Sequence, residues 1–119
     1  MTSKEEFVQK LLKRTKQIAL DIILLSKSLP NNDEGRIIKR QIIRSATSVG
    51  ANYRAVCRAR SSREFFAKLS ITVEEADETL YWLEIIEESG MLKNDFSSAL
   101  IKEVTEVLSI LATARKNTK

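Results

Sequence analysis

The chain has 119 residues, of which 43% are hydrophobic and 30% charged, and its net charge is +4. This size and composition fit one globular domain over residues 1–119. Three glycines and one proline are too few for the turns of a many-stranded β fold, so the composition predicts an all-α protein. The chain contains no histidine, which excludes histidine-based catalysis and histidine metal ligands.

Cysteine content and hydropathy exclude further classes of protein. Cys57 is the only cysteine, so neither an internal disulfide nor a thiolate zinc site is expected. The longest uninterrupted apolar run, residues 22–25, is far shorter than the ~20 residues of a membrane span. The first residues lack the pattern of a signal peptide. We therefore expect a cytoplasmic protein without a cofactor or a membrane partner.

The first predicted helix covers residues 3–28. Ser3 and Glu6 have the spacing of a capping box, and Pro30 disfavours continuation of the helix. Apolar residues recur at steps of three and four, which predicts one buried stripe: Phe7, Val8, Leu11, Leu12, Ile18, Ala19, Ile22, Ile23 and Leu25.

The second predicted helix covers residues 34–59. Gly50 interrupts it at a cost of roughly 1 kcal/mol relative to alanine, which suggests that a neighbouring element approaches closely there. Its inner stripe consists of Ile38, Ile42, Ala46, Val49, Tyr53 and Val56.

Two more helices follow. The third is predicted to begin at a capping box formed by Ser61 and Glu64 and to end before Gly90, a typical residue after a helix. Its stripe is Phe65, Phe66, Leu69, Val73, Ala76, Leu80 and Leu83. The fourth is predicted to start near Asn94 or Asp95 and to end near Arg115, with Phe96, Leu100, Val104, Val107, Leu108 and Leu111 inside. Short connections predict an antiparallel, up-down-up-down four-helix bundle.

Charge is sorted along the chain. Residues 36–68 hold nine basic side chains and one acidic one, whereas residues 74–88 hold seven acidic side chains and no basic one. On a helix, five arginines fall within an arc of about 80° opposite the apolar stripe: Arg36, Arg40, Arg44, Arg54 and Arg58. Guanidinium groups suit phosphate oxygens, so this row predicts a nucleic-acid-binding face. The alternative is a solvated face whose charge is offset by acids of a neighbouring helix.

Base stacking is not expected, because no aromatic residue lies in the arc of arginines. On the same helix a polar row recurs at steps of four, three and four: Gln41, Ser45, Ser48 and Asn52. Buried amides and hydroxyls need partners and can align helices or subunits, so Asn52 is a candidate interface residue. A partly exposed boundary row is the alternative.

A second apolar row on the third helix lies opposite its inner stripe and predicts a subunit interface. We expect the acidic residues within it to meet arginines of the next chain. The candidate interface residues are Ile71, Glu74, Glu78, Trp82 and Ile85. Scattered exposed hydrophobes are the alternative. No metal site is predicted, because carboxylate metal centres in bundles also use histidines.

The stretch from Gln41 to Asn52 (QIIRSATSVGAN) resembles the central motif of the 23S rRNA intervening-sequence proteins, a bacterial family of four-helix bundles. The resemblance continues through residues 51–55, 58–61, 64–65, 74–78 and 82–84. Many members of the family follow the asparagine with Ile-Ala-Glu-Gly, whereas this chain has Tyr53-Arg54-Ala55-Val56. The chain therefore resembles an arginine-rich branch, whose partner can differ.

This resemblance implies a non-enzymatic protein that assembles into a ring, commonly a pentamer. The sequence also resembles the accessory protein of diversity-generating retroelements, which binds nucleic acid and a reverse transcriptase. Two hypotheses follow. One is a ring-forming protein that binds structured RNA, with a nucleic-acid-processing protein as a further partner. The other is a homo-oligomeric protein-interaction scaffold without nucleic-acid binding. An enzyme is disfavoured, because no nucleophile is paired with a base.

Overall fold

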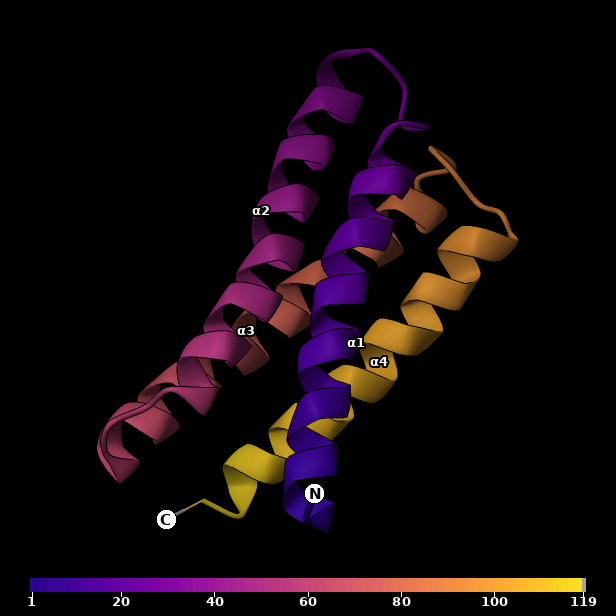
Figure 1. The fold of residues 1–119 in the computed structure, drawn as a ribbon. Coiled ribbons are helices and arrows are strands. Elements are labelled where there is room, and N and C mark those ends of the chain that lie inside the picture. Colours follow the sequence, from indigo (N-terminus) through magenta and orange to yellow (C-terminus); the bar gives the residue numbers. More distant parts are fainter. Residues whose placement is uncertain (119) are drawn as a thin grey trace.

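The computed structural model describes residues 1–118, in which four helices and no strand occur (Figure 1). Within this part of the chain the all-α prediction is confirmed. The helices are α1 (Ser3–Ser26), α2 (Asp33–Cys57), α3 (Ser62–Glu88) and α4 (Asp95–Lys116). Helices α1 and α2 each end two residues before their predicted ends.

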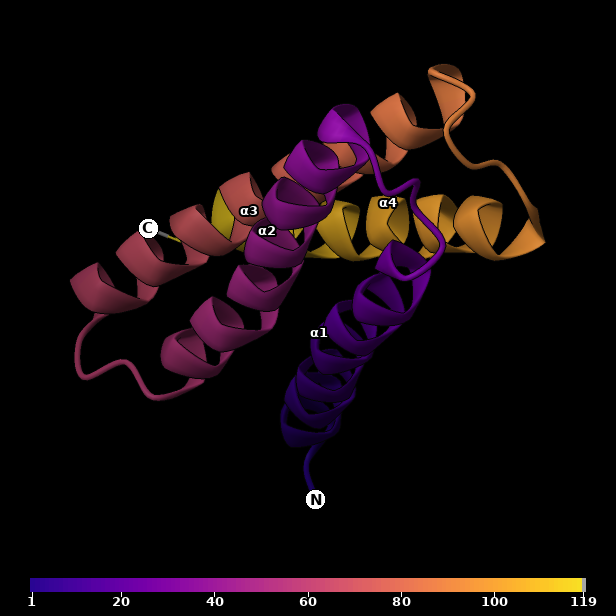
Figure 2. The same cartoon turned by 90° about the horizontal axis from the view of Figure 1, so that it is seen from above.

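Each helix contacts the next one in the chain, and α1 also contacts α4. These contacts, and the opposite directions of successive helices in Figure 1, are consistent with the up-down-up-down order expected from the sequence. The contact between α2 and α3 is the most extensive and that between α1 and α4 the least. Figure 2 shows α1 diverging from α4 toward its N-terminal end. Where the two helices meet, Arg14 donates to both carboxylate oxygens of Glu103 at 2.9 and 2.7 Å.

The helix starts follow cap chemistry, with one shift from the prediction. The N-cap of α1 is Thr2, whose hydroxyl accepts from the backbone N–H of Glu5, so the capping pair predicted at Ser3 is wrong by one residue. Threonine and serine both cap well, and a glutamate also lies three residues after Thr2. The N-cap of α3 is Ser61, as predicted, and it accepts from the N–H of Glu64.

The core is built from one stripe of each helix. For α2 the stripe is the predicted one, and all six of its residues are buried. In the other helices hydroxyl side chains occupy core positions that the apolar pattern did not indicate. Thr15, Thr72 and Thr79 are fully buried, and each hydroxyl donates to the carbonyl four residues earlier. These bonds satisfy the hydroxyls of Thr15 and Thr72 within their own helices, whereas the Thr79 hydroxyl also lies within hydrogen-bond distance of Ser45 on α2.

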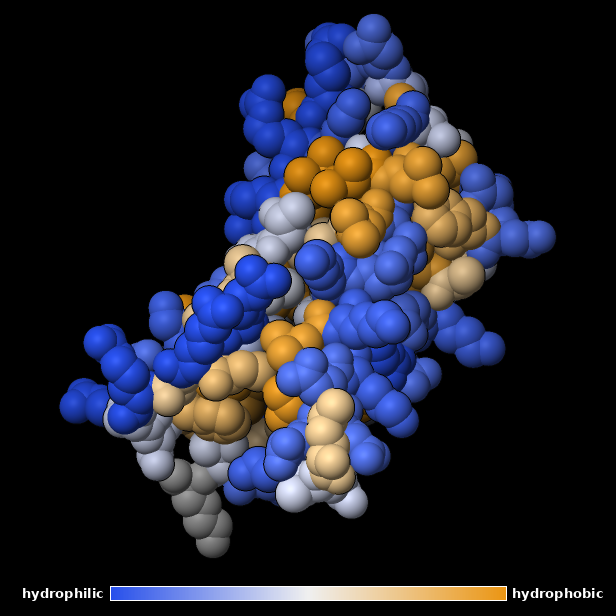
Figure 3. All heavy atoms as spheres, in the orientation of Figure 1, coloured by the Kyte–Doolittle hydropathy of each residue, from blue (hydrophilic) through white to orange (hydrophobic). Residues whose placement is uncertain are grey.

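Several apolar residues predicted for the core are exposed instead: Phe7, Ile23, Phe65, Phe66 and Phe96. Phe7 is 47% exposed, and it lies in the N-terminal part of α1, which diverges from α4 (Figure 2). Apolar side chains also gather over the C-terminal half of α1 in Figure 3. There Leu24 is 56% exposed, and Leu20 and Ile23 are exposed beside it.

Two glycines lie at close contacts between segments of the chain. A Cβ atom on Gly50 would lie 3.4 Å from the carbonyl oxygen of Thr15, which confirms the predicted close approach of a neighbouring helix, α1. A Cβ atom on Gly35 would lie 1.8 Å from the carbonyl oxygen of Pro30. Gly90 follows α3 with a φ of 78°, the left-handed conformation expected after a helix.

These contacts give different expectations for the same substitution. We expect Gly35→Ala to lower the free energy of unfolding by about 1–3 kcal/mol, because the Pro30 backbone must move. Gly50→Ala places its methyl group at van der Waals distance and gains helix propensity, so it should be neutral or stabilise by up to about 1 kcal/mol. Urea denaturation of both variants checks this. Equal midpoints for the two variants would contradict the assigned contacts.

Candidate functional site

The structure divides the five predicted arginines of α2 between different environments. Arg36 forms an ion pair with Asp33 one turn away, at 2.6 Å. Arg44 forms ion pairs with two glutamates of α3. Arg40, Arg54 and Arg58 are exposed, and none of the three forms an ion pair within residues 1–118. The arc therefore does not act as one uniform surface.

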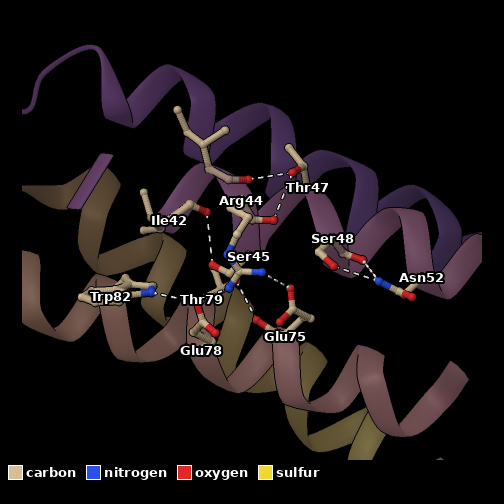
Figure 4. Close-up of polar contacts among 11 residues, drawn as sticks. Ile42, Arg44, Ser45, Thr47, Ser48, Asn52, Glu75, Glu78, Thr79 and Trp82 are labelled. Carbon is tan, nitrogen blue, oxygen red and sulfur yellow. Dashed lines mark hydrogen bonds and ion pairs between the residues drawn. The ribbon is translucent and has the colours of Figure 1, made fainter. Parts of the chain in front are cut away.

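Arg44 joins α2 to α3 (Figure 4). Its Nη1 lies 2.9 Å from Oε2 of Glu75, and its Nη2 pairs with Oε2 of Glu78. The same oxygen of Glu78 accepts from the indole Nε1 of Trp82 at 3.1 Å. The pKa of Glu78 is lowered, most strongly by the hydrogen bond from Trp82 and also by the positive charge and hydrogen bond of Arg44. Glu78 is thus paired inside its own chain, in contrast to the expected pairing with an arginine of the next chain.

The polar row of α2 is only partly buried. Ser45 is fully buried and accepts from the hydroxyl of Thr79 at 3.0 Å, which links α2 to α3. Asn52 is half-buried, and its side-chain amide donates to the carbonyl and the hydroxyl of Ser48, at 2.9 and 2.8 Å. Within one chain, the residue that aligns two helices is Ser45, whereas Asn52 is bonded only within its own helix.

The predicted interface row of α3 is less uniform than expected. Ile71 is 40% exposed and Glu74 is also exposed. Trp82 and Ile85 are half-buried and pack against the core, so the prediction that both face away from it is wrong in part. The indole of Trp82 lies beside α2 because Glu78 accepts its N–H next to Arg44.

A groove with a volume of about 730 Å³ lies between α1 and α2. We call it the basic groove, because five of its lining side chains are cations and none is a carboxylate. Small residues, among them Gly50 and Ala51, line its α2 side. The cations are Lys10, Lys13 and Lys16 from α1 and Arg54 and Arg58 from α2.

The register of the two helices sets the cations opposite one another. Gly50 lies beside Thr15 and Lys16, and α1 and α2 run in opposite directions. Counting from this contact, Lys13 is level with residues 52–53 and Lys10 with residues 55–56, so Arg54 and Arg58 each lie within one helical turn of a lysine across the groove. Cations on both walls can therefore reach one anion between them. None of the five forms an ion pair within residues 1–118, so their charge is not offset inside the described chain.

The three lysines were missed by sequence reasoning, although they recur at steps of three. That reasoning assigned charge to one helix at a time. The signal that could have found them is Gly50: a glycine that admits α1 against α2 also brings the charged residues on α1 beside Arg54. The basic groove is thus a property of the helix pair.

Other kinds of site receive no support from the described residues. Residues 1–118 contain no cluster of three or more acidic or cysteine side chains that could hold a metal ion. None of the four helices is both long and apolar enough to cross a bilayer. Cys57 is an exposed residue that lines the basic groove, and partial desolvation of its thiol raises the pKa of that group.

Residues 8–113 match the family model described as 23S rRNA-intervening sequence protein. A crystal structure from Bacteroides thetaiotaomicron, described as a protein with unknown function from the S23 ribosomal protein family, is 31% identical. The match covers 92% of this chain and 98% of that one, with a TM-score of 0.83. No curated protein matches.

The Arg44 cluster gives a pH-dependent expectation. Glu78→Gln should lower the free energy of unfolding at neutral pH by about 1 kcal/mol or less, the usual range for partly exposed ion pairs. The pKa of Glu78 is lowered in the folded chain. Its stabilisation is therefore present above the unfolded pKa of about 4.3 and is lost as the pH falls through the folded value.

The free energy of unfolding of the wild type and of Glu78→Gln is measured by denaturation at neutral and acidic pH. We expect the difference between the two proteins to become smaller as the pH falls. Glu74→Gln is the matched control, since Glu74 is exposed and forms no ion pair within the described residues. A difference that stays constant from neutral to acidic pH would contradict the role given to the carboxylate.

Proposed function

The chain belongs to the 23S rRNA-intervening sequence protein family, and we propose that it is a non-enzymatic protein that binds structured RNA through the basic groove. The observation that supports this most is the set of five cations on both walls of one groove that contains no carboxylate. Phosphate oxygens are the ligands that such a groove suits, because lysine and arginine together offer many donors and no acceptor. Binding through phosphates carries no base identity, so affinity should depend little on sequence.

The proposal revises which arginines carry the binding. Arg54 and Arg58 line the basic groove, whereas Arg44 is held by Glu75 and Glu78. Arg36 and Arg40 lie farther along α2, near its start, where they extend the positive surface beyond the groove. We therefore assign the main phosphate contacts to the groove cations and only a supporting role to the N-terminal half of α2.

Matched lysine variants test the groove. We expect Lys10→Gln with Lys13→Gln to weaken RNA binding at low salt by about tenfold or more. The slope of log affinity against log salt should also flatten by roughly 0.7–0.9 for each phosphate that the variant no longer neutralises. Lys93→Gln with Lys102→Gln removes the same charge from exposed positions outside the groove and should change both quantities little. Fluorescence anisotropy with labelled RNA measures both. Equal weakening in the two double variants would show that net charge, and not the groove, carries binding.

Self-association is the second part of the proposal. The family resemblance implies a ring, commonly a pentamer, and two exposed apolar surfaces support contact between copies. One surrounds Ile71 on α3, and the other is the group of Leu20, Ile23 and Leu24 on α1. Isolated exposed hydrophobes are common, but three on one helix face are better covered by a neighbour. A nucleic-acid-processing protein is a further candidate partner for such a ring.

Light scattering tests the assembly. We expect a mass several times that of the 13.5 kDa chain for the wild type, and a smaller mass for Ile71→Lys and for Leu24→Lys, since each buries a charge in the proposed contact. Ile37→Lys changes an exposed apolar residue of α2 outside both surfaces and serves as the control. A monomer mass for the wild type at micromolar concentration would contradict the ring. An assembled protein that binds no RNA at low salt would favour the scaffold function instead.

A further inference from the structure

A second recess lies just beyond the end of the basic groove. Its volume is about 390 Å³, and its lining runs from Ala59 through the turn between α2 and α3 to Phe65, with Thr118 from the end of the chain. Arg58 lines the groove and Ala59 lines the recess, so the two are adjacent along the chain. Figure 1 shows this turn at the same end of the molecule as the start of α1 and the end of α4. The chain from Arg58 to Ala59 therefore joins the lining of the groove to the lining of the recess.

Phe65 is the aromatic residue of this recess, and it is 36% exposed although the sequence pattern predicted it for the core. The neighbouring ring of Phe66 has the guanidinium of Arg115 over it, at 4.8 Å from the ring centre. Phe65 has no such cation and no aromatic partner among residues 1–118. Of the two rings, Phe65 is thus the one that can still receive a flat ligand group.

The surroundings of Phe65 are cationic. Arg60 lines the same recess, and its side chain is almost fully exposed. Its contact with Glu64, at 3.4 Å, is a long one-turn pair that competes weakly with solvent. Arg63, in the first turn of α3, is exposed as well. A positively charged path that leads to an exposed aromatic ring is the arrangement by which proteins hold single-stranded nucleic acid.

We propose that Phe65 stacks on an unpaired base of the nucleic acid whose phosphates occupy the basic groove. This inference rests on the proposed function and narrows its ligand to RNA with unpaired nucleotides, such as loops, bulges and ends. In a blunt duplex every base is stacked within the helix and cannot reach the ring. The arc of arginines on α2 contains no aromatic residue for base stacking, and Phe65 near the start of α3 provides one.

The test compares a labelled single-stranded oligoadenylate with a blunt RNA duplex of the same length. We expect the wild type to prefer the single strand. Phe65→Leu keeps an apolar side chain but removes the aromatic face, so it should weaken single-strand binding by roughly five- to a hundredfold, the range for removal of one stacked base. Duplex binding should be unchanged. The slope of log affinity against log salt should also be unchanged, because no charge is removed.

Two further variants complete the test. Phe65→Trp should restore the preference for the single strand, since stacking needs only an aromatic face. Phe96→Leu changes a ring of the same exposure at the start of α4, at the opposite end of the bundle, and should have no effect. A strand that carries 2-aminopurine should change its fluorescence on binding to the wild type and not to Phe65→Leu.

The outcomes separate this inference from the proposed function. If the wild type binds nucleic acid but Phe65→Leu keeps the full preference for the single strand, the stacking site is overturned and the groove stands. If Phe65→Leu weakens single-strand and duplex binding equally, a structural role replaces the stacking role. If the wild type binds neither probe at low salt, the proposed function fails and the stacking site with it.

Discussion

The close contact between α1 and α2 at Gly50 determines the rest of the candidate site. Because Gly50 has no side chain, the backbone of α1 passes within van der Waals distance of α2 at Thr15. This contact fixes the register that places Arg54 and Arg58 of α2 within one helical turn of Lys13 and Lys10 of α1. A large side chain at this position would push the helices apart and separate the two walls of cations. The absence of a large side chain at position 50 therefore allows the close approach of the two helices that forms the basic groove.

A second constraint divides the charge of the molecule. Part of the acidic run of α3 faces α2, where Glu75 and Glu78 form ion pairs with Arg44. These carboxylates do not pair with the arginines of the basic groove, Arg54 and Arg58. Ser45 and Thr79 form a buried hydrogen bond between the same two helices. The contact between α2 and α3 thus both neutralises charge and aligns the two helices. The surplus of positive charge lies at the other contact, between α1 and α2. This separation lets one small bundle be stable and still present a surface of positive charge that is not paired within the described residues.

The helix termini could be predicted from the sequence to within two residues, because capping residues, Pro30 and Gly90 mark these termini locally. The sequence also identified the α2 stripe and the need for a close neighbour at Gly50. The environments of the arginines could not be predicted, since Arg44 depends on which face of α3 turns toward α2. The exposure of Phe65 was missed for a related reason. A helical pattern places an aromatic residue on the inner face, but only the tertiary structure shows that α3 begins beyond the end of the core.

The most direct measurement uses Cys57, which is the only cysteine and lines the basic groove. Its rate of alkylation by a thiol reagent can be compared in the free protein and in the presence of saturating RNA at low salt. We expect RNA to slow alkylation severalfold, and high salt, which displaces the RNA, to restore the rate of the free protein. An unchanged rate at saturating RNA would contradict the account, because the nucleic acid would then be bound outside the groove.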